Sequence, residues 1–270
     1  MTATKPTDRG ELMRLVAAIA DLASEAGARI LSIAAENPAP RTKPDLSPVT
    51  PADEAAEEII LRGLGKILPG VPVIAEEAVS HRKPPRPRGS YLLVDPIDGT
   101  RELIAGRGEY TVNIALIEDN APVLGIVYAP KFNTLFAGAS DAALRGMVAA
   151  GEKFAIGTAA PIRARARPEM LTAFVSRTHP DRASDEFLAR LPVVEKIPLG
   201  SSLKFARLAE GAGDVYARLA PVNEWDIAAG HAVLTAAGGA VTAPDGTPIL
   251  FGTHDGFHVA GFIAWGAKPA

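Results

Sequence analysis

A short apolar run, Tyr91 to Val94, leads directly into the hexapeptide Asp95-Pro96-Ile97-Asp98-Gly99-Thr100. The run predicts a buried strand that delivers Asp95, and Asp98-Gly99 predicts a turn behind it. Carboxylates at the edges of buried elements repel one another unless a cation lies between them. By itself the segment is consistent with a plain turn that contains two acids. If other acids lie close to it in the fold, the segment predicts a metal site.

Helical and strand-like patterns alternate along the rest of the chain. Apolar residues recur at helical spacing from Glu11 to Ala35, and Thr50-Pro51-Ala52-Asp53 predicts the start of a second helix, with Thr50 as its cap. Further helices are predicted at 181–191, 202–211 and 225–237, and strands at 71–75, 91–94, 111–117, 123–128, 172–176, 193–197, 215–218, 240–242 and 257–263. The two strands around Asp119-Asn120 predict a hairpin. Small residues with weak periodicity leave 137–161 without a clear assignment.

The composition excludes several classes of protein. The 270 residues contain no cysteine, which excludes disulfides, zinc–thiolate sites, iron–sulfur clusters and thiol nucleophiles. The formal net charge of -3 gives no overall basic field for nucleic acid or a membrane surface. Residues 1–10 are polar, and no apolar run approaches the roughly 18 residues of a membrane span. We therefore expect a cytoplasmic protein that does not insert into membranes and does not bind nucleic acid.

Several acids lie where a predicted element begins or ends. They are Asp45, Asp53, Glu76, Asp95, Asp98 and Asp226. Each one alone has an ordinary explanation, because an acid at a helix start is commonly a cap and Glu76-Glu77 is also consistent with a solvated strand end. Taken together, these acids would supply only oxygen ligands. In a chain without cysteine, such ligands favour Mg²⁺ or Mn²⁺ over zinc.

The order of these segments resembles the inositol monophosphatase superfamily, whose members are lithium-sensitive, metal-dependent phosphomonoesterases. The resemblance rests on Glu76-Glu77, the segment from Asp95 to Thr100, and Trp225-Asp226-Ile227-Ala228-Ala229-Gly230. It covers nearly the whole chain. It implies an α+β fold, a layered αβαβα sandwich of the inositol monophosphatase/fructose-1,6-bisphosphatase type. We expect a single compact unit with an N-terminal half at 1–135, which carries most metal ligands, and a C-terminal half at 136–270, which closes the cleft.

Three segments narrow the resemblance to the 3'(2'),5'-bisphosphate nucleotidases, and within them to the bacterial CysQ type. They are Lys43 to Asp53, which contains Ser47-Pro48-Val49-Thr50, then Gly200-Ser201-Ser202-Leu203-Lys204, and Arg101-Glu102-Leu103 directly after Thr100. Leu103 replaces the phenylalanine of the family pattern. The resemblance implies hydrolysis of adenosine 3',5'-bisphosphate, a by-product of sulfate assimilation, to AMP and phosphate, and extends to its 5'-phosphosulfate relative.

The resemblance also implies two or three Mg²⁺ ions. Glu76, Asp95 and the carbonyl oxygen of Ile97 would hold the first, and Asp95 would bridge to a second held by Asp98 and Asp226. A third, weaker site would lie at Asp45 or Asp53. Catalytic residues implied by the family are Glu76, Thr100, Asp45 and Thr50. Water is the expected nucleophile, oriented by Glu76 and the Thr100 hydroxyl, with Thr50 helping Asp45 at the outer site.

The expected substrate contacts are Gly99, Thr100, Gly200, Ser201, Ser202, Lys204 and Glu224. Backbone N–H groups of Gly99 and Thr100 would meet a phosphate oxygen, and those of Gly200 to Ser202 the second phosphate. Lys204 would bind the second phosphate, although a lysine on an amphipathic helix is also a common surface residue. Glu224 would reach a sugar hydroxyl or act as a helix-start acid. Trp225 is expected to pack in the core, and no histidine is given a catalytic role.

Two further readings stay open. The same scaffold serves inositol monophosphatases and sugar bisphosphatases, and some superfamily members act without catalysis in transcription or ribosome assembly. The arginine-rich segment 81–89 is either a solvated loop or a guide for anionic substrates. A monomer is favoured over a dimer by analogy with the bisphosphate nucleotidases.

Overall fold

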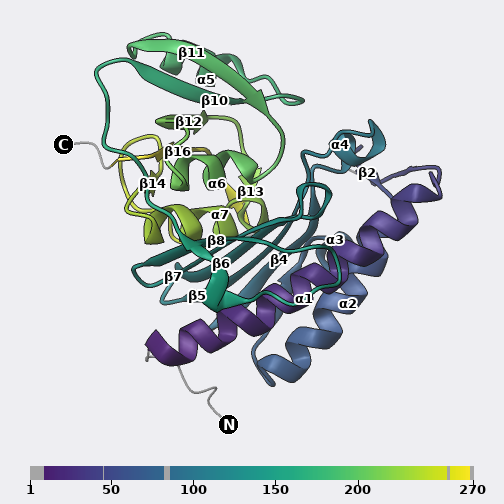
Figure 1. The fold of residues 1–270 in the computed structure, drawn as a ribbon. Helices are drawn as coiled ribbons and strands as arrows, with labels where there is room; N and C mark the ends of the chain where they lie inside the picture. The colour runs from purple at the N-terminus through teal and green to yellow at the C-terminus, as the bar shows by residue number, and fades with distance from the viewer. Residues whose placement is uncertain (1–8, 45, 82–85, 254–255, 268–270) are drawn as a thin grey trace.

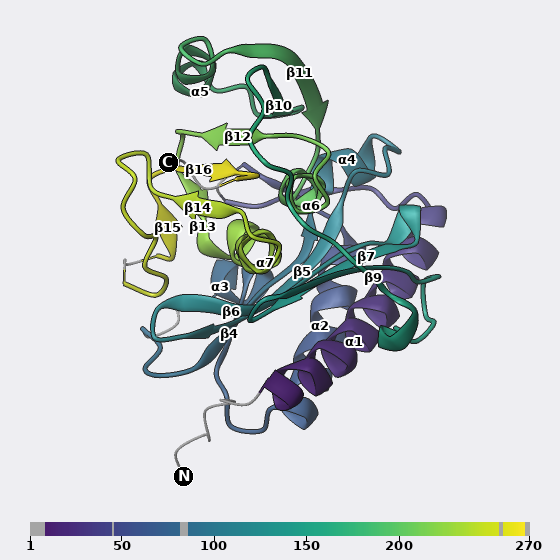
Figure 2. The same cartoon turned by 60° about the vertical axis from the view of Figure 1, so that its left-hand side comes forward.

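The computed structural model describes residues 9–44, 46–81, 86–253 and 256–267, and arranges them in five alternating layers of helix and sheet (Figure 1). Helices α1 (Arg9–Ala35) and α2 (Pro51–Ile67) cover one face of a seven-stranded sheet. Helices α6 (Leu203–Ala209) and α7 (Glu224–Ala236) lie between that sheet and a five-stranded one, and α5 (Arg182–Leu188) lies outside the latter (Figure 2). The predicted αβαβα sandwich is confirmed.

The seven-stranded sheet follows the order of the chain. Its strands are β3 (Val73–Ala75), β4 (Tyr91–Asp98), β5 (Thr111–Glu118), β6 (Ala121–Ala129), β7 (Thr134–Ala139), β8 (Ala142–Met147) and β9 (Ala160–Pro161). Only β3 and β4 run parallel. Asp119 and Asn120 both have positive φ, 48° and 62°, as a two-residue hairpin turn requires, so the predicted hairpin is confirmed. Residue 135 lies within β7.

The five-stranded sheet has the order β11-β10-β12-β16-β14. Its strands are β10 (Leu171–Ser176), β11 (Val193–Leu199), β12 (Val215–Arg218), β14 (Ala240–Thr242) and β16 (Phe262–Trp265). The strand predicted at 257–263 is divided, because β15 (His258–Val259) pairs with β13 (Val222–Asn223) instead. The remaining elements are β1 (Arg41–Thr42), β2 (Pro48–Val49), α3 (Glu76–His81), α4 (Thr100–Ile104), η1 (Pro130–Phe132) and η2 (Ile156–Thr158).

Helix α7 is buried between the two sheets, and after the acids of its first turn it is therefore mostly apolar on every side. Two glycines allow it to lie close to the larger sheet. A Cβ atom at Gly125 would stand 2.3 Å from the carbonyl oxygen of Ala229, and one at Gly138 would stand 2.5 Å from Cα of Val233. Side chains at either glycine would push the helix away, and its first turn carries Asp226. Among the described helices, none has both the length and the apolar character to cross a membrane.

Candidate functional site

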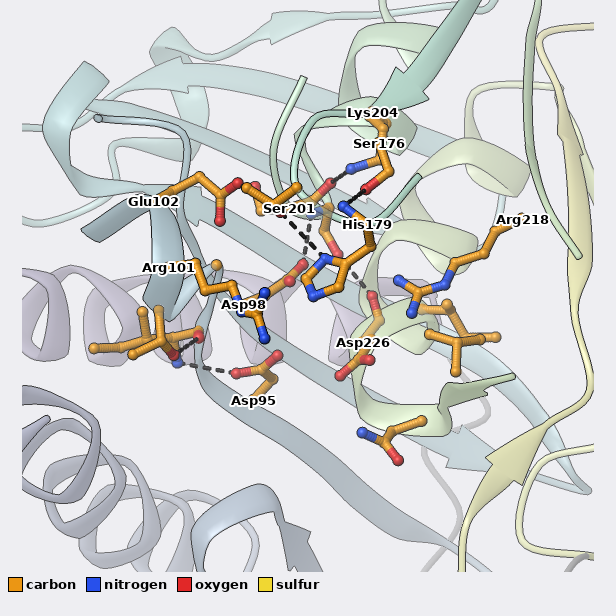
Figure 3. Close-up of a pocket in the computed structure, with 18 of the residues that line it drawn as sticks. Asp95, Asp98, Arg101, Glu102, Ser176, His179, Ser201, Lys204, Arg218 and Asp226 are labelled. Carbon is orange, nitrogen blue, oxygen red and sulfur yellow. Dashed lines mark hydrogen bonds between the residues drawn. The ribbon is translucent and has the colours of Figure 1, made fainter. Parts of the chain in front are cut away.

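A cavity of about 230 Å³ is lined by residues from both halves of the chain (Figure 3). The predicted site residues that line it are Glu76, Asp95, Ile97, Asp98, Gly99, Thr100, Ser201, Ser202, Lys204 and Asp226. Thr50, Asp53, Gly200 and Glu224 are described but do not line it. Asp45 lies outside the described residues. The structure thus brings together most of the residues that the sequence predicted for metal and phosphate.

A β-bulge in β4 places Asp95 and Asp98 on one face of the sheet. The strand continues to Asp98, four residues beyond its predicted end at Val94, and the predicted turn follows at Gly99, which has a left-handed φ of 102° before α4. Asp95 pairs with Asn113 and Asp98 with Thr111, so three steps along β4 match two along β5. In a regular strand, residues three apart face opposite sides, and the extra residue restores the same side. Pro96, which has no N–H to donate, lies within this irregular stretch.

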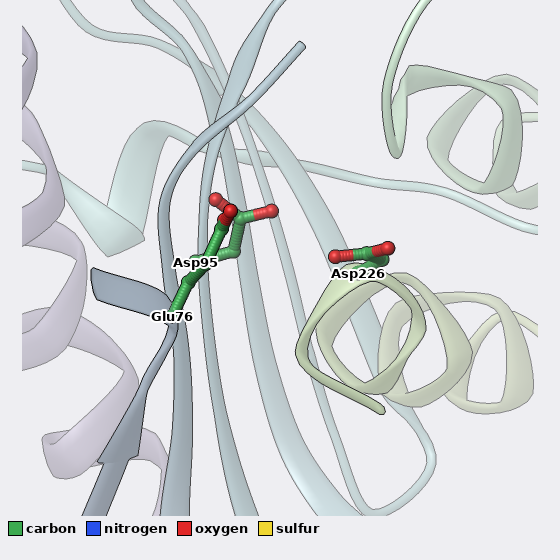
Figure 4. Close-up of side chains that lie close together, drawn as sticks. All are labelled: Glu76, Asp95 and Asp226. Atoms are coloured by element: carbon green, nitrogen blue, oxygen red, sulfur yellow. The ribbon is translucent and has the colours of Figure 1, made fainter. Parts of the chain in front are cut away.

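Three carboxylates converge from different elements (Figure 4). Glu76 begins α3, Asp95 lies in β4 and Asp226 lies in the first turn of α7, and each offers an oxygen within 4.8 Å of the others. Burial, followed by the charges of Glu76, Asp98 and Asp226, raises the pKa of Asp95 well above its ordinary value. Burial, followed by the charges of Asp98 and Glu76, raises the pKa of Asp226 well above its ordinary value. Oxygen-only donors that carry negative charge suit a hard divalent cation such as Mg²⁺.

Asp98 is held by groups from two other elements. Its Oδ2 accepts hydrogen bonds from the backbone N–H of Ser202 at 2.6 Å and from Nδ2 of Asn113 at 3.3 Å. The Ser202 hydroxyl accepts from Asn113 and donates to the carbonyl oxygen of Asp226 at 2.8 Å. Ser202 therefore links Asp98 to the start of α7, and its N–H is already engaged by protein.

Thr100 and Thr50 both bond to Asp53, which is 1% exposed. Thr50 caps α2, and its N–H and hydroxyl donate to Asp53 Oδ2 at 2.8 and 2.7 Å, which confirms the predicted cap. The Thr100 hydroxyl donates to Asp53 Oδ1 at 3.0 Å and stands 3.3 Å from the Ile97 carbonyl oxygen. Burial raises the pKa of Asp53, although the bonds from Thr50 and Thr100 oppose this.

Lys43 is a buried cation for which the sequence predicted no role. Its Nζ lies 2.7 Å from Glu76 Oε1 and 2.6 Å from Glu77 Oε1. Burial alone would lower the pKa of Lys43, but these two glutamates raise it. Burial and the charge of Glu76 raise the pKa of Glu77 to about 7. Glu77 is buried in α3, which corrects the alternative of a solvated strand end.

Lys204 is buried beside the cavity and does not lie on the surface, which excludes the alternative of a surface lysine. Its Nζ donates to the carbonyl oxygens of Leu199 and Ser201 at 3.1 and 2.7 Å, and lies 4.9 Å from the ring centre of Tyr216. Burial, with a smaller effect from Arg218, lowers the pKa of Lys204 to about 8. A lysine held by neutral oxygens keeps its charge available for an anion.

Gly200 is committed to a contact within the protein. Its N–H donates to Glu109 Oε2 at 2.9 Å, and a Cβ atom there would stand 2.5 Å from the Glu109 carbonyl oxygen. Glu109 in turn accepts two bonds from Arg177, at 2.7 and 2.8 Å. The expected contact between the Gly200 N–H and phosphate is therefore not available in this arrangement. Ser201, with φ of 51°, remains at the cavity.

Glu224 does not line the cavity, although it lies two residues before Asp226. Its carboxylate is fully buried and both oxygens accept from the N–H of Gly252, at 3.0 and 2.8 Å. Of the two roles expected, the helix-start acid matches this position and the sugar contact does not. Trp225 is 5% exposed and packs near Phe257, as predicted.

Several residues in the cavity had not been predicted. They are Ser47, Pro48, Arg101, Glu102, Ser176, Thr178, His179, Phe205, Tyr216, Arg218, Val222, Asn223 and Ile227. Because β10 and β12 are parallel neighbours, their carboxyl ends bring Ser176 and Arg218 to the same edge. Burial, then the charges of Arg218 and Arg101, lowers the pKa of His179. The only sequence feature that pointed to any of these residues was the predicted strand that ends at Arg218.

Arg86 and Arg88 of the arginine-rich segment do not line the cavity, and 82–85 lie outside the described residues.

Known proteins are similar to this chain in sequence and in fold. The 3'(2'),5'-bisphosphate nucleotidase CysQ of Escherichia coli (strain K12) is 41% identical over 222 residues, which cover 82% of this chain and 86% of that protein. The histidinol-phosphatase of Mycobacterium tuberculosis (strain ATCC 25618 / H37Rv) is 31% identical over 220 residues, with coverage of 81% and 82%. The crystal structure of CysQ from Bacteroides thetaiotaomicron, a bacterial member of the inositol monophosphatase family, superimposes with a TM-score of 0.79 at 32% identity, over 98% of this chain and 100% of that one.

The match to the family as a whole extends along almost the entire chain. The sequence profile described as "Inositol monophosphatase family" matches residues 11–267, which include every acid of the three-carboxylate cluster. Together with relatives at this identity and coverage, it shows that the chain belongs to the inositol monophosphatase family.

Proposed function

We propose that the chain is a Mg²⁺-dependent phosphomonoesterase that hydrolyses adenosine 3',5'-bisphosphate to AMP and phosphate. Its 5'-phosphosulfate relative is a second substrate of the same kind. One observation carries the proposal: a single cavity holds the cluster of Glu76, Asp95 and Asp226 and also the cations Lys204 and Arg218. The acids suit a metal-assisted reaction at one phosphate, and the cations suit a second phosphate. The relatives named CysQ support the same substrate.

The proposed metal ligands follow the carboxylates. Glu76, Asp95 and the Ile97 carbonyl would hold one Mg²⁺, and Asp95, Asp98 and Asp226 a second. When bound, the ions would neutralise phosphate charge and lower the pKa of the attacking water. Asp53 is better suited to hold Thr100 than to bind a third ion, because both of its oxygens already accept hydrogen bonds.

The chain's own groups would orient the reactants. The Thr100 hydroxyl gives its proton to a hydrogen bond with Asp53, so its oxygen remains free to accept one from water. Glu76 can accept the proton that this water loses. Gly99 and Thr100 would place the reacting phosphate, and Lys204, Arg218 and Ser201 the other one. Gly200 and Glu224 are left out of the proposed substrate site, because their polar groups are engaged elsewhere.

The alternative substrates are other phosphate monoesters on the same scaffold, such as inositol phosphates and sugar bisphosphates. The relative named histidinol-phosphatase makes histidinol phosphate a necessary comparison. Phosphate release with Mg²⁺ should be measured for adenosine 3',5'-bisphosphate, its 5'-phosphosulfate, inositol 1-phosphate, fructose 1,6-bisphosphate and histidinol phosphate. We expect kcat/KM for the nucleotide to be greatest by roughly 100-fold or more, since buried polar groups discriminate strongly.

A matched pair of substrates tests the second phosphate. Adenosine 3'-monophosphate lacks the 5'-phosphate, so Lys204→Met should reduce kcat/KM for the bisphosphate and leave the monophosphate nearly unchanged. A preference for inositol 1-phosphate, or an equal effect of Lys204→Met on both nucleotides, would contradict the assignment. No phosphate release from any compound, with intact binding to RNA polymerase or ribosomes, would favour the non-catalytic alternative.

A further inference from the structure

Glu57, in the middle of α2, has a buried carboxylate that is only 6% exposed. Its Oε2 accepts a hydrogen bond from the backbone N–H of Glu77 at 2.8 Å. Glu57 does not line the cavity and does not belong to the three-carboxylate cluster. Burying a carboxylate is costly unless hydrogen bonds compensate it, so this contact between α2 and α3 is the main feature to explain.

The hydrogen bond between Glu57 and Glu77 lies directly beside Glu76, where the chain reaches the three-carboxylate cluster. Strand β3 ends at Ala75 and α3 begins with Glu76, so the N–H of Glu77 belongs to the peptide group directly after the Glu76 Cα atom. Fixing that N–H fixes the backbone from which the Glu76 side chain extends. Lys43 contacts the other end of the same side chain, at Oε1. Glu76 is therefore held at its backbone by α2 and at its carboxylate by Lys43.

Helix α2 makes a second contact of the same kind one turn earlier. Asp53 and Glu57 are four residues apart and lie on one face of the helix. Asp53 accepts from the Thr100 hydroxyl, and Glu57 accepts from the backbone beside Glu76. One rigid helix thus fixes two separate segments of the site relative to each other.

We propose that Glu57 is a positioning residue, which sets the backbone of the metal ligand Glu76 through its bond to Glu77. The inference rests on the proposed function, in which Glu76 binds Mg²⁺. Residues that orient a metal ligand typically change metal affinity by 10- to 100-fold when they are removed. Glu57 acts on the metal through Glu76 and touches neither metal nor substrate.

The test is calorimetric titration of the metal-free protein with Mn²⁺ or Mg²⁺ alone, using Glu57→Leu and Glu57→Gln. Leucine removes the acceptor, and we expect metal affinity to fall by roughly tenfold or more. Glutamine keeps a carbonyl oxygen at the same place, and we expect an affinity within about threefold of the original protein. The matched control is Glu58→Leu, because Glu58 is exposed on the same helix and should leave the affinity unchanged.

Kinetics provide a second measurement. In Glu57→Leu the Mg²⁺ concentration for half-maximal rate should rise, while KM for the nucleotide at saturating Mg²⁺ stays within about twofold of the original value. A general loss of structure would raise both. Thermal unfolding of the metal-free variants establishes that they fold.

Folded Glu57→Leu with unchanged metal affinity would overturn the inference, as would an equal loss in Glu57→Gln. If Glu57→Leu does not fold, Glu57→Asp takes its place in the test, because aspartate is one methylene shorter than glutamate. Unchanged metal affinity in Glu57→Asp would then overturn the inference. The binding assay needs no substrate. A chain that hydrolyses none of the compounds but loses metal affinity in Glu57→Leu keeps this inference and refutes the proposed function.

Discussion

The Thr100 hydroxyl donates a hydrogen bond to Asp53 Oδ1 at 3.0 Å, which joins the end of the Asp95 to Thr100 segment to the first turn of α2. If Thr100 orients the attacking water, Thr100→Val should reduce kcat by roughly 100-fold, because valine has the same shape without the hydroxyl. Thr100→Ser should retain much of the activity. KM should change little in both, and steady-state rates at saturating Mg²⁺ measure the effect. Near-normal kcat in Thr100→Val would exclude this role.

Asp95 lies where three carboxylates meet, so replacing it should separate activity from stability. Asp95→Asn should lower phosphate release by roughly 1,000-fold or more, since it removes a ligand shared by both proposed ions. The metal-free variant should unfold at the same or a higher temperature, because one buried negative charge is removed. Magnesium-dependent turnover close to that of the unaltered protein would contradict the metal site.

Magnesium itself should stabilise the folded protein. A ligand at 100 times its Kd adds about 2.7 kcal/mol to the free energy of unfolding if it does not bind the unfolded chain. Thermal unfolding with excess Mg²⁺ should therefore occur at a higher temperature than with EDTA. Asp95→Asn should lose most of this difference, and Glu58→Leu should keep it. An equal shift in all three proteins would indicate binding outside the cluster.

The sequence predicted those parts of the fold that local interactions determine. The start of α2 depends on Thr50 and Asp53, and the hairpin turn depends on Asp119 and Asn120, which tolerate positive φ. Strands β7 to β9 were not predicted, because their small residues show little periodicity. The reason is tertiary: Gly138 is small because α7 lies against it, and the position of α7 cannot be read from nearby residues.

The residues of the site can also be separated into those that short motifs predicted and those that depend on tertiary contacts. Glu76, Asp95 and Asp226 each belong to a short motif, and the resemblance of these motifs to the inositol monophosphatase superfamily predicted that the three acids meet. Arg218 and His179 reach the cavity because β10 and β12 are parallel neighbours, which is a pairing between distant segments. The bond that the Gly200 N–H donates to Glu109 could not be predicted for a related reason, since Glu109 comes from the other half of the chain.

Lys204 should make nucleotide binding depend on pH. Burial and Arg218 lower its pKa to about 8, against opposing effects of Asp98, Glu102 and Glu109. Above that pH the free enzyme loses the charge, so kcat/KM for adenosine 3',5'-bisphosphate should fall between pH 7 and about 9.5. Adenosine 3'-monophosphate should show a smaller fall, and Lys204→Arg should remove the difference, because arginine stays charged.

The same shift has the opposite effect on stability. The folded pKa lies below the 10.5 of the unfolded chain, so the unfolded state binds more protons between about pH 8 and 10.5. The contribution of Lys204 to the free energy of unfolding therefore increases as the pH rises through this window. Denaturant unfolding of the original protein and Lys204→Met across the window should show the increase only in the former.

Glu109 should control substrate affinity from outside the cavity. It accepts two bonds from Arg177 and one from the N–H of Gly200, and so fixes the segment that leads to Ser201 and Lys204. Arg177 also donates to the carbonyl oxygen of Pro198 at 2.6 Å. Glu109→Ala should loosen this segment and raise KM for the bisphosphate by roughly tenfold, the equivalent of about 1.4 kcal/mol.

The expected pattern distinguishes positioning from catalysis. In Glu109→Ala, kcat should stay within about twofold, because the carboxylate cluster and Thr100 are not altered. KM for adenosine 3'-monophosphate should change less than KM for the bisphosphate, since the affected segment faces the second phosphate. Glu186→Ala removes an exposed partner of Arg182 and serves as the control. A loss of kcat with unchanged KM would place Glu109 in the chemical step. Equal changes of KM for both nucleotides would show that the segment held by Glu109 does not bind the second phosphate.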